Sequence, residues 1–465
     1  MGAGHAASAP PGVALPWHLG LPRASRQGAR GEYDIAYHSH SWQDCGAVAP
    51  PRPPHDPLAA PVPPGPGFSR APLAGCSPAA PSRGCCYPHG ERGMRRRALL
   101  SALPLAALPG RGKGAGAEAS PQIRDILGRG VQLPRPPRRI VLTQARHVLA
   151  MALLHPDPVS LVVGWGDDLR RMNPPDYASV RARFPQADAV PVIARGQGEG
   201  LSLEAIVAAR PELVVFSLGT LRALGETMPD RLAAFGIPSA VIDFFSDPMA
   251  TTRPSMHLLG QVLGRPERAA AFEAFYTERL QGIAARLEGP AQARPAVFIH
   301  AHAGGTSCCS SPGKGAFDSM VSFAGGHNIG ADLLPGPVGN VSLEYVIDRD
   351  PQVYVATGGP YGGRGGIPLG PGVAPEAAAR ELAAVIHRER LDVLPAVRQG
   401  RAHAIWHGFN DTPAHVVMLE ALARWLHPAR CGDLDPAATM AALNARFLAI
   451  PMQGAHWTDL PAGAL

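Results

Sequence analysis

The sequence predicts an α/β protein of two lobes, each with a mostly parallel sheet flanked by helices, joined by one long rigid helix. Three observations support this fold class. Short apolar runs alternate with helical patterns, as in parallel sheets that are covered on both faces. The alternation stops at residues 254–288, where apolar side chains recur at helical spacing, and then restarts. One helix-to-strand segment occurs twice, once on each side of this helix.

Residues 1–93 precede the predicted lobes and show no sustained helical or strand period. They are rich in Pro, Gly, Ala and Ser, a composition that buries too little apolar surface to offset the entropy of ordering. We expect this segment to be disordered, and we interpret it as an extension created by a wrongly assigned start. The alternative is a genuine disordered N-terminal region.

Residues 94–117 have the pattern of a secretory signal peptide. Met94 is followed by three arginines and a short apolar run, and residues 115–117 are small residues suited to cleavage before Glu118. The arginine pair also resembles a twin-arginine export signal. We therefore predict that the protein starts at Met94 and is exported to the periplasm.

The formal charge of +6 at pH 7 comes from this leader region. Residues 1–117 hold twelve basic and five acidic residues, so their balance is +7, and that of residues 118–465 is −1. A nearly neutral folded part gives no electrostatic argument for a nucleic-acid partner. After residue 117, no apolar run reaches the roughly 18 residues that would span a membrane.

The first lobe is predicted over residues 118–253, the linking helix over 254–288 and the second lobe over 289–465. A joint at Gly264-Arg265-Pro266 lies near the start of the linker, and one continuous amphipathic helix is expected from about 266 to 288. The predicted strands of the first lobe are 139–142, 161–164, 213–217 and 240–243, with a helix at 202–209. Those of the second lobe are 296–300, 353–357 and 402–406.

The repeated segment joins a short helix to a buried strand in each lobe. Residues 201–207 and 341–347 both contain Ser-Leu-Glu, and a proline follows seven residues after each glutamate. The serine is suited to a helix N-cap, and the helix dipole favours the glutamate in the first turn. The match predicts that the two lobes are related.

These motifs, in this order, resemble the periplasmic substrate-binding proteins of ABC importers for iron complexes, haem and vitamin B12. The resemblance covers about residues 136–450, from Arg139-Ile140-Val141 to the segment 394–401. It implies a ligand held between the lobes and a permease in the cytoplasmic membrane as partner. In this family, one surface glutamate of each lobe docks on permease arginines, and Glu204 and Glu344 match these positions. The alternative is that each glutamate only stabilises its helix N-terminus.

The resemblance predicts a binding protein and not an enzyme. We expect it to capture an iron complex of the ferric siderophore type as a monomer, with no resident cofactor and no nucleic-acid partner. Vitamin B12 and haem are alternatives within the family. An exported chelatase-like metal enzyme is the alternative of another class, because metal chelatases have a similar fold. No convincing nucleophile–base set is present in the sequence, so no catalytic residue is predicted.

The ligand should bind beyond the carboxyl ends of the strands, as in other parallel α/β lobes. Tryptophans after two strands offer flat faces for a chelate or macrocycle, and cationic side chains offer partners for its negative charge. The glycine-rich run 358–366 would let the backbone approach a bulky ligand. Packed rings and solvated charges are the alternative. The predicted ligand-binding residues are Trp165, Arg170, Arg195, His302, Lys314, Tyr361, Arg364, Trp406, His407 and Asn410.

The loop after the strand at 296–300 is open to two interpretations. Its histidines and cysteines could form a soft metal site, drawn from His300, His302, Cys308, Cys309 and His327. The spacing matches no standard zinc pattern, so no metal site is predicted. In an oxidising compartment we expect instead a disulfide between Cys308 and Cys309, or between one of them and Cys431.

Overall fold

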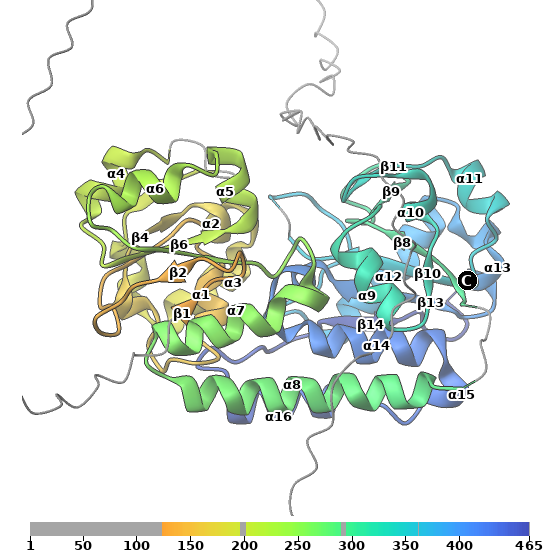
Figure 1. Cartoon of the computed structure of the whole chain (residues 1–465). Helices are drawn as coiled ribbons and strands as arrows, with labels where there is room; N and C mark the ends of the chain where they lie inside the picture. Colours follow the sequence, from red (N-terminus) through yellow and green to blue (C-terminus); the bar gives the residue numbers. More distant parts are fainter. Residues whose placement is uncertain (1–122, 196–200, 290–293, 361, 465) are drawn as a thin grey trace, which may run out of the picture. The chain divides into compact units, whose positions relative to one another are not determined.

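The computed structural model describes residues 123–195, 201–289, 294–360 and 362–464 of the chain. The predicted disordered segment and signal peptide lie outside these residues. Two five-stranded sheets form, each flanked by helices, and the α/β fold class with a long linking helix is confirmed (Figure 1). Both sheets lie in one compact unit, Leu108–Leu465. No helix in the described part of the chain is long and apolar enough to cross a membrane.

The first sheet is entirely parallel, with the strand order β5-β4-β3-β6-β7. A short antiparallel hairpin precedes it. The strands are β1 (Ile123–Arg124), β2 (Gly130–Val131), β3 (Ile140–Leu142), β4 (Val162–Gly166), β5 (Val192–Ala194), β6 (Leu213–Ser217) and β7 (Ser239–Ile242). The helices are α1 (His147–Met151), α2 (Asp168–Met172), α3 (Pro174–Arg183), α4 (Leu203–Ala209), α5 (Leu218–Leu224) and α6 (Met228–Ala233), with 3₁₀ turns at Val159–Leu161 and Pro185–Ala189.

The second sheet has the order β10-β8-β12-β13-β14, and only the edge strand β14 is antiparallel. Its strands, with those of a small β11-β9 ribbon, are β8 (Ala296–His300), β9 (Ser310–Ser311), β10 (His327–Asn328), β11 (Gly339–Asn340), β12 (Val353–Gly358), β13 (Ala402–Trp406) and β14 (Trp457–Asp459). The helices are α9 (Ala316–Phe323), α10 (Gly330–Leu333), α11 (Leu343–Asp348), α12 (Pro375–Arg388), α13 (Pro395–Arg398), α14 (Val416–Leu426), α15 (Pro428–Cys431) and α16 (Pro436–Arg446), with 3₁₀ turns at Leu391–Val393, His407–Asp411 and Pro413–His415.

The two lobes repeat one topology. The order β4-β3-β6-β7 in the first sheet corresponds to β10-β8-β12-β13 in the second, and the Ser-Leu-Glu helices α4 and α11 lead into the corresponding strands β6 and β12. Both helices begin in the same way. The Ser202 hydroxyl accepts the Ala205 N–H at 3.1 Å, and the Ser342 hydroxyl accepts the Tyr345 N–H at 3.1 Å. The predicted N-caps are therefore present in both lobes.

The linker consists of two helices, α7 (Pro248–Val262) and α8 (Pro266–Leu287), with the predicted joint between them. In Figure 1, α8 passes below both sheets; α14 packs against it, and α16 packs against α14. Arg268 of α8 donates to the carbonyl of Leu153 in the first lobe at 2.9 Å and to that of Phe447, after α16, at 2.8 Å. The linking helix is therefore part of a helical layer, which the sequence patterns did not indicate.

A buried hydrogen bond ties this layer to the second lobe. The Tyr276 hydroxyl of α8 lies 2.6 Å from Nε2 of His415, and both side chains are fully buried. We expect Tyr276→Phe to lower the free energy of unfolding by about 1–3 kcal/mol, because it leaves Nε2 of His415 buried without a partner. Urea unfolding would measure this loss. The matched control is Tyr345→Phe, whose hydroxyl donates to the Ile329 carbonyl on a more accessible side chain, and an equal loss in both variants would contradict the prediction.

Candidate functional site

The loops at the carboxyl ends of the strands meet at Arg146, which follows β3. Its Nε lies 2.8 Å from Oδ2 of Asp168, at the start of α2, and its Nη1 pairs with Oδ2 of Asp411, after β13. Arg146 is thus held between a carboxylate of its own lobe and one of the other lobe. The side chains of Asp168 and Asp411 are only 2% and 9% exposed, so this three-charge cluster is largely withdrawn from water.

The loop backbone fixes the position of Asp168. Its Oδ1 accepts the Ala145 N–H at 2.6 Å, and its Oδ2 accepts the Arg146 N–H at 3.2 Å. A Cβ atom at Gly166 would lie 2.8 Å from Oδ1 of Asp168 and 2.7 Å from the carbonyl oxygen of Thr143. Only glycine therefore allows β4 to approach this closely. The sequence analysis did not select Arg146, although its place just after a predicted strand was a usable signal.

The second lobe contributes a pair of stacked histidines. The rings of His302, after β8, and His407, after β13, have centroids 3.8 Å apart. Nδ1 of His407 lies 2.9 Å from the Thr357 hydroxyl at the end of β12, and Nε2 lies 3.3 Å from the amide nitrogen of Asn410. Three predicted ligand-binding residues, His302, His407 and Asn410, are therefore brought together, and Thr357 joins them from the strand between.

Burial keeps both imidazoles neutral. It lowers the pKa of His302 to about 4, and the positive charge of Arg364 acts in the same direction. Burial also holds the pKa of His407 well below its usual value, with smaller effects from His302 and Arg146. At neutral pH these five side chains are one guanidinium, two carboxylates and two neutral imidazoles, so their charges sum to −1, and the buried carboxyl of Asp176 and the exposed guanidinium of Arg364 act on them from outside this set.

The two predicted tryptophans do not present their faces to a ligand. Trp165 is 2% exposed and packs edge-on against Tyr177, and Trp406 is 4% exposed. A Cβ atom at Gly408 would lie 2.2 Å from the Trp406 ring, so glycine is what lets the loop fold over this ring. Both rings lie near the ends of buried strands and pack in the core, as in the alternative of packed rings, and Trp406 also lines a small cavity between the lobes.

The predicted cationic residues lie outside the enclosed cluster. Arg170 is exposed, lies over the Tyr177 ring at 5.1 Å and is 3.8 Å from Asp188, so it is engaged within the first lobe. Arg195, Lys314 and Arg364 are exposed, and Tyr361 lies outside the described residues. An anionic ligand would therefore meet these cations at exposed loop positions and not at the Arg146 cluster.

Glu204 and Glu344 occupy equivalent, exposed positions in the first turns of α4 and α11. In Figure 1 both helices lie on the side of the lobes opposite α8. The pKa of each carboxyl is lowered by its own backbone N–H and by the serine hydroxyl at the N-cap. The corresponding helix starts of the two lobes therefore each carry an ionised, accessible carboxylate, a geometry that is compatible with the predicted docking points.

The cysteines follow one of the two expected pairings. Cys308 and Cys309 form a disulfide, and Cys431 is a free, buried thiol at the end of α15. His327 pairs with Asp332 at 3.1 Å, so the alternative metal set that included His327 is not assembled.

A small cavity lies at the base of the interface between the lobes. Its volume of about 30 Å³ holds only one or two water molecules. Among its lining residues are Asp176 of α3, in the first lobe, and Trp406 and Thr412 of the second. A ligand larger than this does not fit in this cavity as it stands.

Asp176 should make the stability of the protein depend on pH. Burial raises its pKa from 3.8 to about 7. The folded protein then keeps a proton that the unfolded chain releases near pH 3.8, so the stability contributed by Asp176 is present below that pH and lost as the pH rises toward 7. The slope of the free energy of unfolding against pH approaches about 1.4 kcal/mol per pH unit.

Urea unfolding at several pH values should give a flatter profile for Asp176→Asn. The variant Asp230→Asn, at an exposed position of α6, should leave the profile unchanged. Parallel profiles for all three proteins would contradict this prediction.

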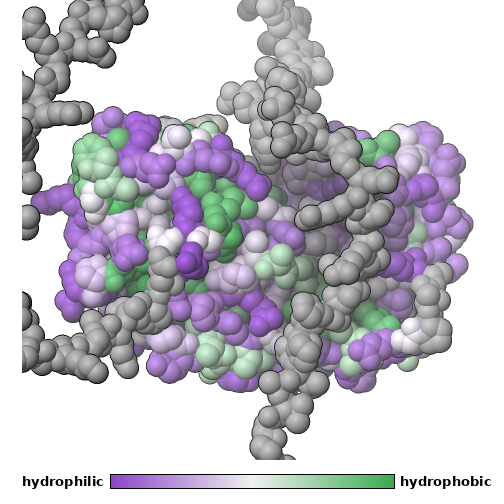
Figure 2. Space-filling view, viewed as in Figure 1, coloured by the Kyte–Doolittle hydropathy of each residue, from purple (hydrophilic) through white to green (hydrophobic). Residues whose placement is uncertain are grey.

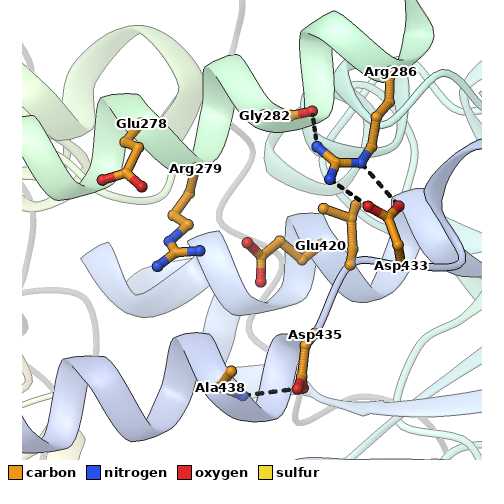
Figure 3. A pocket seen from close by; sticks show the side chains of 9 residues that line it. Glu278, Arg279, Gly282, Arg286, Glu420, Asp433, Asp435 and Ala438 are labelled. Atoms are coloured by element: carbon orange, nitrogen blue, oxygen red, sulfur yellow. Dashed lines mark hydrogen bonds and ion pairs between the residues drawn. The ribbon is translucent and has the colours of Figure 1, made fainter.

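A larger cavity of about 360 Å³ lies away from the strand ends, within the helical layer. Figure 3 shows Arg279 of α8 and Glu420 of α14 pointing toward it, and Arg286 paired with Asp433 at its edge. Glu420 is 2% exposed, and burial raises its pKa. Side chains of both charges line this cavity, so its charge does not indicate a particular class of ligand.

On the face shown in Figure 2, the described surface is mainly hydrophilic. The largest hydrophobic area on the face shown lies on the first lobe, on the side toward the second lobe.

Comparisons with known proteins identify relatives of this architecture. A family model described as "Periplasmic binding protein" matches residues 151–405, more than half of the chain. The Cobalamin-binding protein of Halobacterium salinarum is 30% identical over 180 residues, which are 37% of this chain and 44% of that protein. The Vitamin B12-binding protein of Photorhabdus laumondii is 29% identical over 178 residues, which are 38% of this chain and 59% of that protein. The match thus spans about half the length of these relatives.

One solved structure shows the same fold over nearly its whole length. The TroA-like periplasmic binding protein FepB from Veillonella parvula superposes with a TM-score of 0.68 at 22% identity, covering 73% of this chain and 99% of that chain.

Proposed function

Because this chain belongs to the periplasmic binding protein family, we propose that it is the substrate-binding component of an ABC importer. It captures a metal-containing macrocycle of the corrinoid class between its lobes and delivers it to a permease. It acts outside the cytoplasmic membrane, after export by the signal sequence at residues 94–117. It binds its ligand without transforming it.

The choice of ligand rests on the charge of the cluster formed by Arg146, Asp168, Asp411, His302 and His407. Arg146 is already neutralised by Asp168 and Asp411, and His302 and His407 are uncharged at neutral pH. A local charge of −1 disfavours an anionic ferric siderophore, which would have to bring further negative charge into a partly dry site. A corrinoid with no net charge and many amide groups meets no such cost. The predicted ferric siderophore is therefore replaced by a corrinoid as the first candidate.

Two further observations support this choice. The two curated relatives described above are named for cobalamin or vitamin B12. The hydrophobic area on the first lobe lies on the side toward the second lobe (Figure 2), where a macrocycle could cover it. One observation favours an anionic chelate instead: Lys314 and Arg364 are exposed cations on loops of the second lobe.

Titration of the purified protein with three ligands would test the proposal. Tryptophan fluorescence and calorimetry should detect saturable binding of cyanocobalamin, and weaker or no binding of haemin and of an anionic ferric catecholate. The variant Asp411→Asn removes one negative charge from the cluster. It should strengthen binding of the ferric catecholate while changing cyanocobalamin affinity little.

The possible outcomes test the choice of ligand separately from the receptor function. Binding of only haemin or only the ferric catecholate would overturn the corrinoid assignment and keep the receptor function. Binding of none of the three would count against both. Insertion of a metal into a metal-free macrocycle by the purified protein would instead favour the chelatase-like enzyme.

A further inference from the structure

Three side chains from distant parts of the second lobe converge below the loop that follows β8. His300 ends β8, Cys308 lies in the loop, and Glu389 is the C-cap residue of α12. Nε2 of His300, Sγ of Cys308 and a carboxylate oxygen of Glu389 all lie within 4.8 Å of one another. This set shares no residue with the Arg146 cluster or with the stacked histidines.

Two of these atoms are buried without hydrogen-bond partners. Nε2 of His300 and Oε2 of Glu389 face each other at 3.6 Å, which is too long for a hydrogen bond, and neither atom has another partner. Buried polar atoms without a hydrogen-bond partner destabilise the fold. A cation between them would satisfy both atoms at once.

The surroundings orient both groups as ligands. Nδ1 of His300 lies 3.1 Å from the hydroxyl of Tyr354, a fully buried residue on the adjacent strand β12. A histidine that binds a metal through one ring nitrogen is usually oriented by a hydrogen bond at the other. The backbone N–H of Gly304 holds the Glu389 carboxylate.

The spacing fits a tetrahedral ion. Bond lengths of about 2.1 Å for zinc to nitrogen and oxygen place neighbouring ligand atoms about 3.4 Å apart. The 3.6 Å between Nε2 of His300 and Oε2 of Glu389 is close to this edge. A thiolate at Cys308 would complete a Cys-His-Glu set with a fourth position left for water. Cys308 is, however, bonded to Cys309, and a disulfide sulfur is not a thiolate.

We propose that His300, Cys308 and Glu389 form a zinc site that opens when the Cys308–Cys309 disulfide is reduced. A dithiol reductant supplies two electrons and two protons. The S–S bond breaks, two thiols form, and the reductant becomes a disulfide. Zn²⁺ then replaces the thiol proton of Cys308, which passes to solvent. The site therefore binds metal in the reduced protein and releases it when the disulfide forms again.

The two cysteines supply a matched pair of variants. Cys309→Ser leaves Cys308 as a permanent free thiol, so it should bind metal without any reductant. Cys308→Ser also abolishes the disulfide but removes the ligand, so it should not. Both changes are made in the full chain with the other five cysteines replaced by serine, which removes competing thiols.

Titration with Co²⁺ as a spectroscopic substitute for Zn²⁺ reads out the site directly. The protein with both cysteines should show a thiolate-to-cobalt absorption band only after treatment with dithiothreitol and anaerobic desalting. Cys309→Ser should show the band at one equivalent without treatment. Competition with Zn²⁺ should give an affinity reduced by about 10–100-fold in Tyr354→Phe, which removes the hydroxyl that orients His300.

The results can overturn the proposal in several ways. Equal cobalt affinity in Cys308→Ser and Cys309→Ser, or an unchanged affinity in His300→Gln, would refute it. Absence of the band in both the reduced protein and Cys309→Ser would also refute it. His300 and Glu389 would then be a buried pair that binds no metal. Circular dichroism establishes that each variant is folded. If Cys309→Ser does not fold, cobalt binding is compared between the reduced parent protein and its His300→Gln variant instead.

Discussion

Replacing Arg146 with methionine should lower the free energy of unfolding by about 3–5 kcal/mol, the usual cost of removing one partner from a buried charge cluster. Methionine keeps much of the side-chain length but removes the only cation that contacts both Asp168 and Asp411 in the described residues. Two carboxylates with little exposure would then repel each other across the lobe interface. The interlobe contact should weaken together with the fold.

Urea unfolding monitored by circular dichroism would measure this loss. Arg170→Met is the matched control, because Arg170 is exposed and pairs with Asp188 only at 3.8 Å; its loss should stay below about 1 kcal/mol. Adding Asp168→Asn and Asp411→Asn to Arg146→Met should recover part of the stability, since the uncompensated charges are then gone. A cost below that of the Arg170 control would mean that the cluster does not hold the lobes.

Reversing the charge of both docking glutamates, Glu204→Arg and Glu344→Arg, should reduce ligand uptake by cells more than about tenfold, because like charges placed opposite each other cost several kcal/mol. Ligand affinity should stay unchanged, because both side chains are exposed on α4 and α11 and do not belong to the Arg146 cluster or the stacked histidines. Uptake of labelled ligand and calorimetry on the purified protein would measure the two quantities separately.

A matched control separates docking from local helix stabilisation. Glu267 and Glu376 are exposed glutamates in the first turns of α8 and α12, the same helical position as the docking pair. The double variant Glu267→Arg and Glu376→Arg loses the same favourable interaction with the helix dipole but should transport normally. Equal uptake in the two double variants would refute the docking role. Loss of ligand affinity in the docking variant would instead place the glutamates at the ligand site.

The fold was largely predictable because its signals are local. The strand at 213–217 was expected at the positions it occupies, and the helix expected from about 266 to 288 is Pro266–Leu287. Continuous apolar runs and helical spacing are properties of neighbouring residues, so they can be recognised without knowledge of the tertiary contacts. The antiparallel edge strand Trp457–Asp459 was missed, because three residues carry too little pattern.

The site was predictable as a region but not as a set of contacts. The rule that ligands bind beyond strand ends selected His302, His407 and Asn410, and the structure brings these three side chains together. The same rule selected Trp165 and Trp406, whose rings are buried, because it cannot tell a side chain that ends a strand in the core from one that leaves it.

The sequence alone determined that this chain has two related α/β lobes, a helical linker and a matching Ser-Leu-Glu helix start in each lobe. These features follow from periodicity, helix capping and a repeated motif, all of which are encoded within short segments. The tertiary structure alone decided which charges neutralise one another. Arg146 and Asp411 are 265 residues apart, and His300 and Glu389 belong to different elements. Burial and electrostatic pairing depend on distances in space, and a sequence pattern does not give those distances.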